Sequence, residues 1–101
     1  MNYKVLNDEN IFRKFLNNAE RTERELLGSP HLQTISRAIA SYEEGAGGQG
    51  RYLLCELITQ LGMEKHADTI VKFCEHNLAK AHELTHPIAW RAIQRQNAKT
   101  E

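Results

Sequence analysis

The sequence is poor in several residue types that would mark a specialised class of protein. It contains two cysteines, Cys55 and Cys74, and two prolines in 101 residues. Two cysteines in apolar stretches do not make a disulfide framework, so we expect buried free thiols in a reducing compartment. No run of about 20 apolar residues is present to form a membrane helix, and residues 1–8 lack an apolar run of signal-peptide length. We therefore expect a cytoplasmic protein without membrane contact.

The sequence also lacks a surplus of either charge. Lysine and arginine number 13, aspartate and glutamate number 13, and the formal net charge is zero. A general nucleic-acid binder needs extra cations to displace counterions from phosphates, so the balance argues against nucleic acid as a partner. The length is that of one domain, 1–101. Because the chain begins at Met1, we expect a complete small gene product.

What is present is helical periodicity along most of the chain. Apolar residues recur at spacings of three and four, with glycine or proline between the periodic stretches. The first apolar face consists of Ile11, Phe12, Phe15, Leu16 and Ala19. The spacing predicts helices over 8–27, 30–44, 51–61, 64–85 and 87–97. The sequence therefore predicts an all-α fold, a small bundle of four to five helices.

Glycine and proline mark the expected helix ends. Four glycines fall within residues 45–50, and each costs about 1 kcal/mol in a helix relative to alanine. We therefore expect a flexible Gly-rich connector over 45–50. Gly28 and Gly62 are predicted to end helices, and Ser29-Pro30 is predicted to begin one. Pro87 predicts a break or kink in the helical pattern.

One motif in the sequence points to metal chemistry. Residues 82–86 read His-Glu-Leu-Thr-His, the pattern H-E-x-x-H. Two histidines four apart on a helix can reach one zinc ion, and the adjacent glutamate can act as general base on the metal-bound water. The six residues from Ala81 to His86 resemble the active-site helix of thermolysin-type zinc peptidases. The resemblance implies His82 and His86 as zinc ligands and Glu83 as the base.

The rest of the zinc-peptidase pattern is missing. Those enzymes take a third ligand from a glutamate on a later helix, and the only acid after His86 is Glu101. The further motif positions of metzincins hold Ala89 and Ala92, and Pro87 directly follows the second histidine. A catalytic zinc needs three protein ligands and an open position. We therefore expect no metal and no cofactor, and keep a zinc-dependent hydrolase as an alternative.

A helix-turn-helix DNA-binding regulator is the second alternative. The residues that fit its two helices and the turn between them are Leu54, Leu57, Leu61, Gly62, Met63 and Val71. Two positions depart from the pattern, because Ile58 is bulky where a small residue belongs and Asp68 stands at an inward apolar position. The predicted helix 64–85 is also longer than a short recognition helix.

The last predicted helix carries residue types that are common at binding surfaces. Trp90 is the only tryptophan, and Arg91, Arg95 and Lys99 follow at intervals of four residues as a basic stripe. Tryptophan and arginine are enriched at binding hot spots. We therefore predict that Trp90, Arg91 and Arg95 form part of a protein-contact surface.

The function we predict is that of a small non-enzymatic protein-binding module. A small, neutral helical protein without a catalytic set most often acts by occupying another protein's surface, which is an argument from base rates. Inhibitor, immunity and antitoxin roles fit, including a phage-encoded inhibitor of a host system. Over 64–85 the apolar residues are separated alternately by four and three positions, which forms a seam with the heptad spacing of a helix packed along its length against other helices. A short chain with such a seam often completes its core with a second copy, so a homodimer is a further expectation.

Overall fold

A computed structural model of the chain describes residues 3–26 and 30–99. The helices within these ranges are α1 (Tyr3–Glu25), α2 (His31–Glu43), α3 (Gly47–Gln60), the 3-10 helix η1 (Glu64–His66), α4 (Ala67–His76) and α5 (Leu78–Lys99). No strand occurs in these ranges, so the predicted all-α fold, a small bundle of four to five helices, is confirmed. None of the helices in the described part of the chain is both long enough and apolar enough to cross a bilayer.

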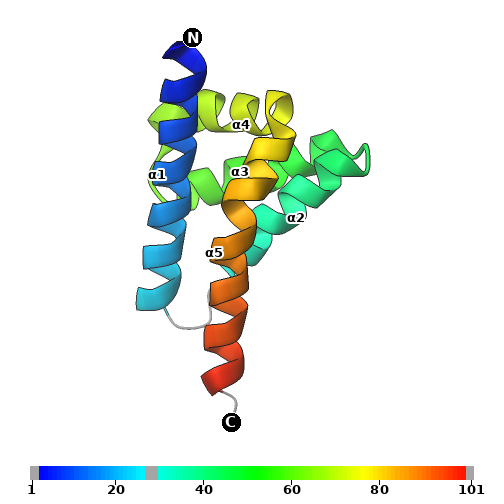
Figure 1. The fold of residues 1–101 in the computed structure, drawn as a ribbon. Coiled ribbons are helices and arrows are strands. Elements are labelled where there is room, and N and C mark those ends of the chain that lie inside the picture. The colour runs from blue at the N-terminus through cyan, green and yellow to red at the C-terminus, as the bar shows by residue number, and fades with distance from the viewer. Residues whose placement is uncertain (1–2, 27–29, 100–101) are drawn as a thin grey trace.

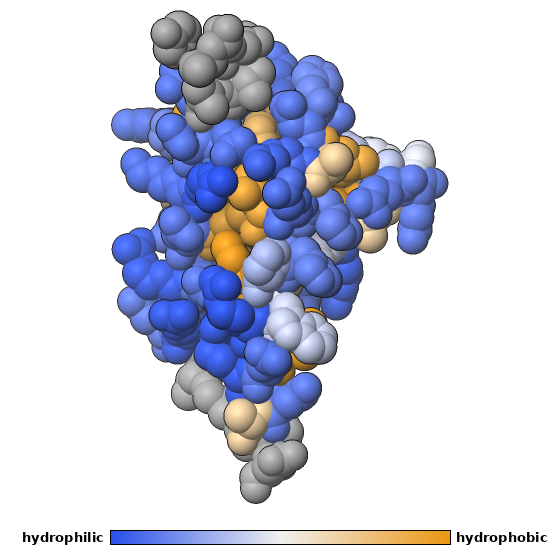
Figure 2. All heavy atoms as spheres, in the orientation of Figure 1, coloured by the Kyte–Doolittle hydropathy of each residue, from blue (hydrophilic) through white to orange (hydrophobic). Residues whose placement is uncertain are grey.

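The helices pack around one apolar core. Figure 1 shows α1 and α5 side by side and running in the same direction, with α4 crossing near the end where both begin. The fully buried core side chains include Phe12, Phe15, Leu16, Leu32, Ile35, Leu54, Ile58, Ile70 and Phe73. The rings of Phe12 on α1 and Phe73 on α4 have centroids 4.9 Å apart. Figure 2 shows that hydrophilic side chains cover most of one face, with an apolar strip between α1 and α5.

The end of α3 is formed by a glycine turn that the sequence predicts. Gly62 has a φ of 71°, a left-handed conformation that glycine adopts without steric cost. Its N–H donates to the Thr59 carbonyl at 3.1 Å, and the Met63 N–H donates to the Ile58 carbonyl at 3.0 Å. This pair of hydrogen bonds is the Schellman motif. It reverses the chain and sets the path of residues 63–66.

The prediction of a flexible connector over 45–50 is wrong about the extent of that connector. A turn at Gly45, whose φ is 84°, ends α2, and α3 already begins at Gly47. A Cβ on Gly50 would lie 2.7 Å from the carbonyl oxygen of Ala38. Because Gly50 has no side chain, α3 can approach α2 closely, and this packing outweighs the low helix propensity of glycine.

The helices predicted over 64–85 and 87–97 are divided differently in the structure. The break lies at Asn77, between α4 and α5, and α5 continues through Pro87. Asparagine disfavours a helix interior because its side chain competes for backbone hydrogen bonds. Pro87 is tolerated because it lies on an exposed flank, where water can bond the Glu83 carbonyl that lacks its helical donor.

The first helix begins earlier than the predicted range 8–27. It spans Tyr3–Glu25, since no glycine or proline interrupts the residues that precede Asp8. The predicted stop at Gly28 and the predicted cap at Ser29 lie outside the described residues. The second helix closely matches its prediction of 30–44.

Two carboxylates of α1 point inward and position the neighbouring helices. Glu23 is 7% exposed and accepts the backbone N–H of Leu32, in the first turn of α2, at 3.0 Å. A negative charge at this end of a helix is favoured by the helix dipole. Glu20 lies 3.5 Å from Arg91 and 3.6 Å from Arg95, both on α5. One polar face of α1 therefore holds both α2 and α5.

A polar cluster joins α2, α3 and α4. The Tyr42 hydroxyl donates to Oε1 of Glu75 at 3.3 Å, and Nε of Arg51 donates to the same oxygen at 3.0 Å. Burial, together with the Glu75 carboxylate, raises the pKa of Tyr42 to about 12. Burial likewise raises the pKa of the Cys74 thiol to about 12. Cys74 is buried as predicted, whereas the prediction was wrong for Cys55, which is exposed.

The free energy of unfolding is expected to fall as the pH rises from about 9 to about 12. In the unfolded chain Cys74 and Tyr42 lose their protons at ordinary pKa values of 9.0 and 10.0, whereas the folded protein keeps both protons until about pH 12. The stabilisation is therefore complete below the unfolded values and is lost as the pH approaches the folded ones. Thermal unfolding across this range measures the decline. An equally steep decline in a Tyr42→Phe/Cys74→Ala variant would contradict the assignment.

Candidate functional site

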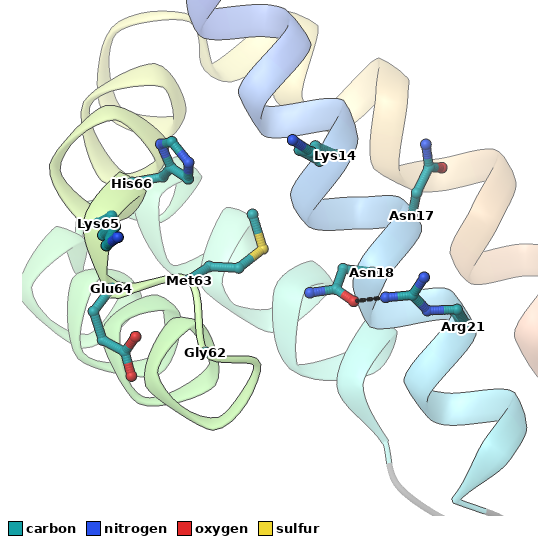
Figure 3. Close-up of a pocket in the computed structure, with 9 residues that line it drawn as sticks. All are labelled: Lys14, Asn17, Asn18, Arg21, Gly62, Met63, Glu64, Lys65 and His66. Atoms are coloured by element: carbon teal, nitrogen blue, oxygen red, sulfur yellow. Dashed lines mark hydrogen bonds between the residues drawn. The ribbon is translucent and has the colours of Figure 1, made fainter.

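A hollow of about 640 Å³ lies between α1 and the segment that joins α3 to α4. Its lining residues are Lys14, Asn17, Asn18, Arg21, Gly62, Met63, Glu64, Lys65 and His66. We call this hollow the basic cleft. Figure 3 shows its two walls, one made by α1 and the other by the turn at Gly62 and the residues that follow it. Met63, which is 8% exposed, extends from the turn toward α1.

The α1 wall follows from the helical spacing of its polar residues. Lys14, Asn18 and Arg21 are separated by four and three residues, so they share one flank of the helix. The same helix buries Phe15 and Leu16 in the core. Its polar flank therefore lies outside the core, on the side of α1 that faces the Gly62 turn. The opposite wall depends on the Gly62 reversal, which places Lys65 and His66 across the hollow from α1.

A short hydrogen-bond chain orients one cation of the basic cleft. Arg21 donates to Oδ1 of Asn18 at 2.7 Å, and Nδ2 of Asn18 donates to the Leu61 carbonyl, at the end of α3, at 3.5 Å. Asn18 therefore bridges the two walls and holds the Arg21 guanidinium at the cleft. A donor that is already oriented loses less conformational entropy when a ligand binds.

The charge of the basic cleft differs from that of the whole chain. Three cations, Lys14, Arg21 and Lys65, line it with the imidazole of His66, and the only lining acid is Glu64. In Figure 3 the Glu64 side chain points downward from the turn and not across the cleft toward Lys14. Among the ion pairs between described residues, none includes any of the three cations. The arrangement offers several free donors to an anion.

The structure brings the two predicted zinc ligands together but adds no third. The rings of His82 and His86 are stacked on α5, with centroids 5.9 Å apart and an angle of 8° between their planes. Nδ1 of His82 lies 3.1 Å from Oε1 of Glu43 on α2. Glu83, the predicted base, is exposed and lies 3.8 Å from Nζ of Lys80. Within residues 3–26 and 30–99, no three His, Cys, Asp or Glu side chains are placed to hold one metal ion.

Comparison with known proteins identifies no relative of the chain. No protein-family model, curated protein or solved structure matches it. The candidate sites therefore rest on the chain's own residues.

The predicted contact residues of the last helix, α5, lie on two different sides of that helix. Trp90 is 54% exposed, whereas Arg91 and Arg95 turn toward Glu20 of α1. Successive helical residues are about 100° apart around the axis, so Trp90 and Arg91 face different sides. The two arginines strengthen the contact between α1 and α5, while about half of the Arg91 side chain stays exposed, as Trp90 does. The side chain of Lys99 lies outside the described residues.

The length of α4 fits the helix-turn-helix alternative, but the charges on its outward face do not. Since α4 has 10 residues, it is much shorter than the predicted helix 64–85 and close to a recognition helix in length. Asp68, however, is exposed and pairs with Lys72 at 3.2 Å. The outward face of α4 therefore places an acid beside its cation, which does not favour contact with phosphates.

Sequence reasoning missed the basic cleft. The local signals were present, since Lys14 and Arg21 share a helix flank and Lys65 and His66 follow the predicted stop at Gly62. Neither signal stands out alone, because cations on a helix flank are usually solvated. Only the packing of the Gly62 turn against α1 makes them one site.

Proposed function

We propose that the protein is a small non-enzymatic protein-binding module that takes an acidic segment of another protein into the basic cleft. The observation that carries the proposal is the unpaired state of Lys14, Arg21 and Lys65, which line one hollow without an ion pair to any described residue. Convergent cations in a concave site favour an anionic ligand and set its orientation. The orienting hydrogen bond from Arg21 to Asn18 supports the same conclusion.

An acidic protein segment fits this site better than a nucleic acid does. The whole chain has zero net charge, whereas three cations and one acid line the cleft. A long polyanion gains affinity from many phosphate contacts along an extended basic surface. A few carboxylates on a short segment match the three cations of the cleft instead. The polar rim of such a contact supplies specificity more than affinity.

The role that we propose is that of an inhibitor, immunity protein or antitoxin that occupies its partner's surface in the cytoplasm, for example a phage-encoded inhibitor of a host system. The small size and balanced charge of the chain support this role. Trp90 belongs to the proposal as a second contact, because an aromatic side chain that is 54% exposed is available to a partner. A second copy of the chain is the alternative partner.

Binding of a labelled acidic peptide tests the proposal directly. The peptide is short and alternates glutamate with aspartate, and its fluorescence anisotropy is measured as the protein is added. It should bind the protein saturably, and more weakly at high salt. Reversing two cleft charges in a Lys14→Glu/Arg21→Glu variant should weaken binding by about tenfold or more. The matched control is Arg37→Glu/Lys80→Glu, which changes the net charge equally at residues that do not line the cleft.

The control separates cleft binding from general attraction. The control variant should bind the peptide within about twofold of the original protein, because screening weakens charges far from the ligand. Equal losses in the two variants would overturn the cleft as the site. Tighter binding of a single-stranded DNA of equal length would replace an acidic protein segment with nucleic acid as the ligand.

A further inference from the structure

The α5 flank that faces α2 carries a second set of ligand-binding groups, independent of the basic cleft. His82 and His86 lie one helical turn apart, with ring centroids 5.9 Å apart and ring planes within 8° of parallel. Both side chains are exposed, so both imidazoles reach the same region of solvent. Residues four apart on a helix are surface neighbours, which is the spacing that lets two histidines bind one ion.

Glu43 of α2 prepares His82 for this role. Its Oε1 lies 3.1 Å from Nδ1 of His82. The carboxylate therefore lies beside Nδ1 of His82, and Nε2 is the ring nitrogen that does not face Glu43. A carboxylate that holds the far nitrogen of a histidine in this way orients a metal ligand and raises its basicity.

A buried hydroxyl provides the second, independent observation. Thr85 is 1% exposed, and its Oγ1 is buried without a hydrogen-bond partner. Together with Ser36, Ile39 and the two histidines, Thr85 lines a hollow of about 110 Å³. A buried polar atom without a partner is costly, and a hollow of this size has room for a few water molecules. The hollow therefore has room for water ligands of an ion that the two imidazoles hold.

We propose that His82 and His86 clamp one divalent transition-metal ion, with Nε2 of His82 and one ring nitrogen of His86 as ligands. Water completes the coordination. Rotation of the exposed rings turns the two nitrogens toward one ion. Imidazole ligands suit Cu²⁺, Ni²⁺ and Zn²⁺, and the general affinity order places Cu²⁺ first. With two protein ligands the ion is exchangeable, which distinguishes this site from a closed structural zinc site.

Metal titration of untagged, metal-free protein tests the proposal. Calorimetry with Cu²⁺, Ni²⁺ and Zn²⁺ in turn should show one ion bound per chain, tightest for Cu²⁺. His82→Ala and His86→Ala should each weaken binding by at least about tenfold, because each leaves a single imidazole. Glu43→Gln should weaken it by about tenfold. His76→Ala, which removes an exposed histidine on α4, is the matched control and should leave the affinity unchanged.

A spectroscopic measurement makes the result specific to the two histidines. The electron paramagnetic resonance spectrum of the Cu²⁺ complex should show two nitrogen ligands, and one nitrogen in either single variant. Circular dichroism confirms that the variants fold, which is expected because both side chains are exposed. Absence of saturable binding, or a loss of affinity in His76→Ala equal to that in His82→Ala, would overturn the proposal.

Discussion

Replacing Phe12 with alanine is expected to lower the free energy of unfolding by about 3–5 kcal/mol. Phe12 is fully buried, and its ring centroid lies 4.9 Å from that of Phe73 and 6.1 Å from that of Phe15. Truncation removes buried apolar area and leaves a cavity between α1 and α4. A domain of this size has a total stability of about 5–15 kcal/mol, so the loss is a large part of the whole. Chemical denaturation followed by circular dichroism measures it.

The matched control for Phe12→Ala is Tyr52→Ala. Tyr52 is 65% exposed, so removing its ring should change the free energy of unfolding by less than about 0.5 kcal/mol. A loss below about 1 kcal/mol in Phe12→Ala would show that α1 does not pack on α4 as described.

The second large effect is expected at Gly50. Its substitution by alanine should lower the free energy of unfolding by about 1–3 kcal/mol. The added Cβ would lie 2.7 Å from the Ala38 carbonyl oxygen and 2.8 Å from the ring of Tyr42. A backbone oxygen cannot rotate away, so α2 and α3 must separate. The gain in helix propensity, about 1 kcal/mol, is too small to offset this overlap.

Gly48 offers a matched control within the same turn of α3. An added Cβ at Gly48 meets nothing within 4 Å. Gly48→Ala should therefore stabilise the protein by up to about 1 kcal/mol through helix propensity and a less flexible unfolded chain. The two substitutions are chemically identical and should have opposite signs. Stabilisation by both would contradict the close approach of α2 and α3.

The sequence by itself determined the helical class and the faces that the helices bury. Phe12, Phe15 and Leu16 recur at helical spacing, and each is at most 1% exposed in the structure. The stop at Gly62 was also predictable, because the preference of glycine for a positive φ is local. The neighbouring positions of His82 and His86 follow from their separation of four residues. Each of these features depends on residues within about one or two helical turns.

The tertiary structure alone decided the features that join distant segments. Gly50 is helical because Ala38, on the preceding helix, lies against it, although the four glycines of residues 45–50 predict a flexible connector. Glu20 turns inward because Arg95 approaches it from the far end of the chain. Lys14 and Lys65 share a cleft because the Gly62 turn packs against α1. The free energy of these arrangements comes from contacts between helices, and local hydrophobic periodicity carries no information about which helices meet.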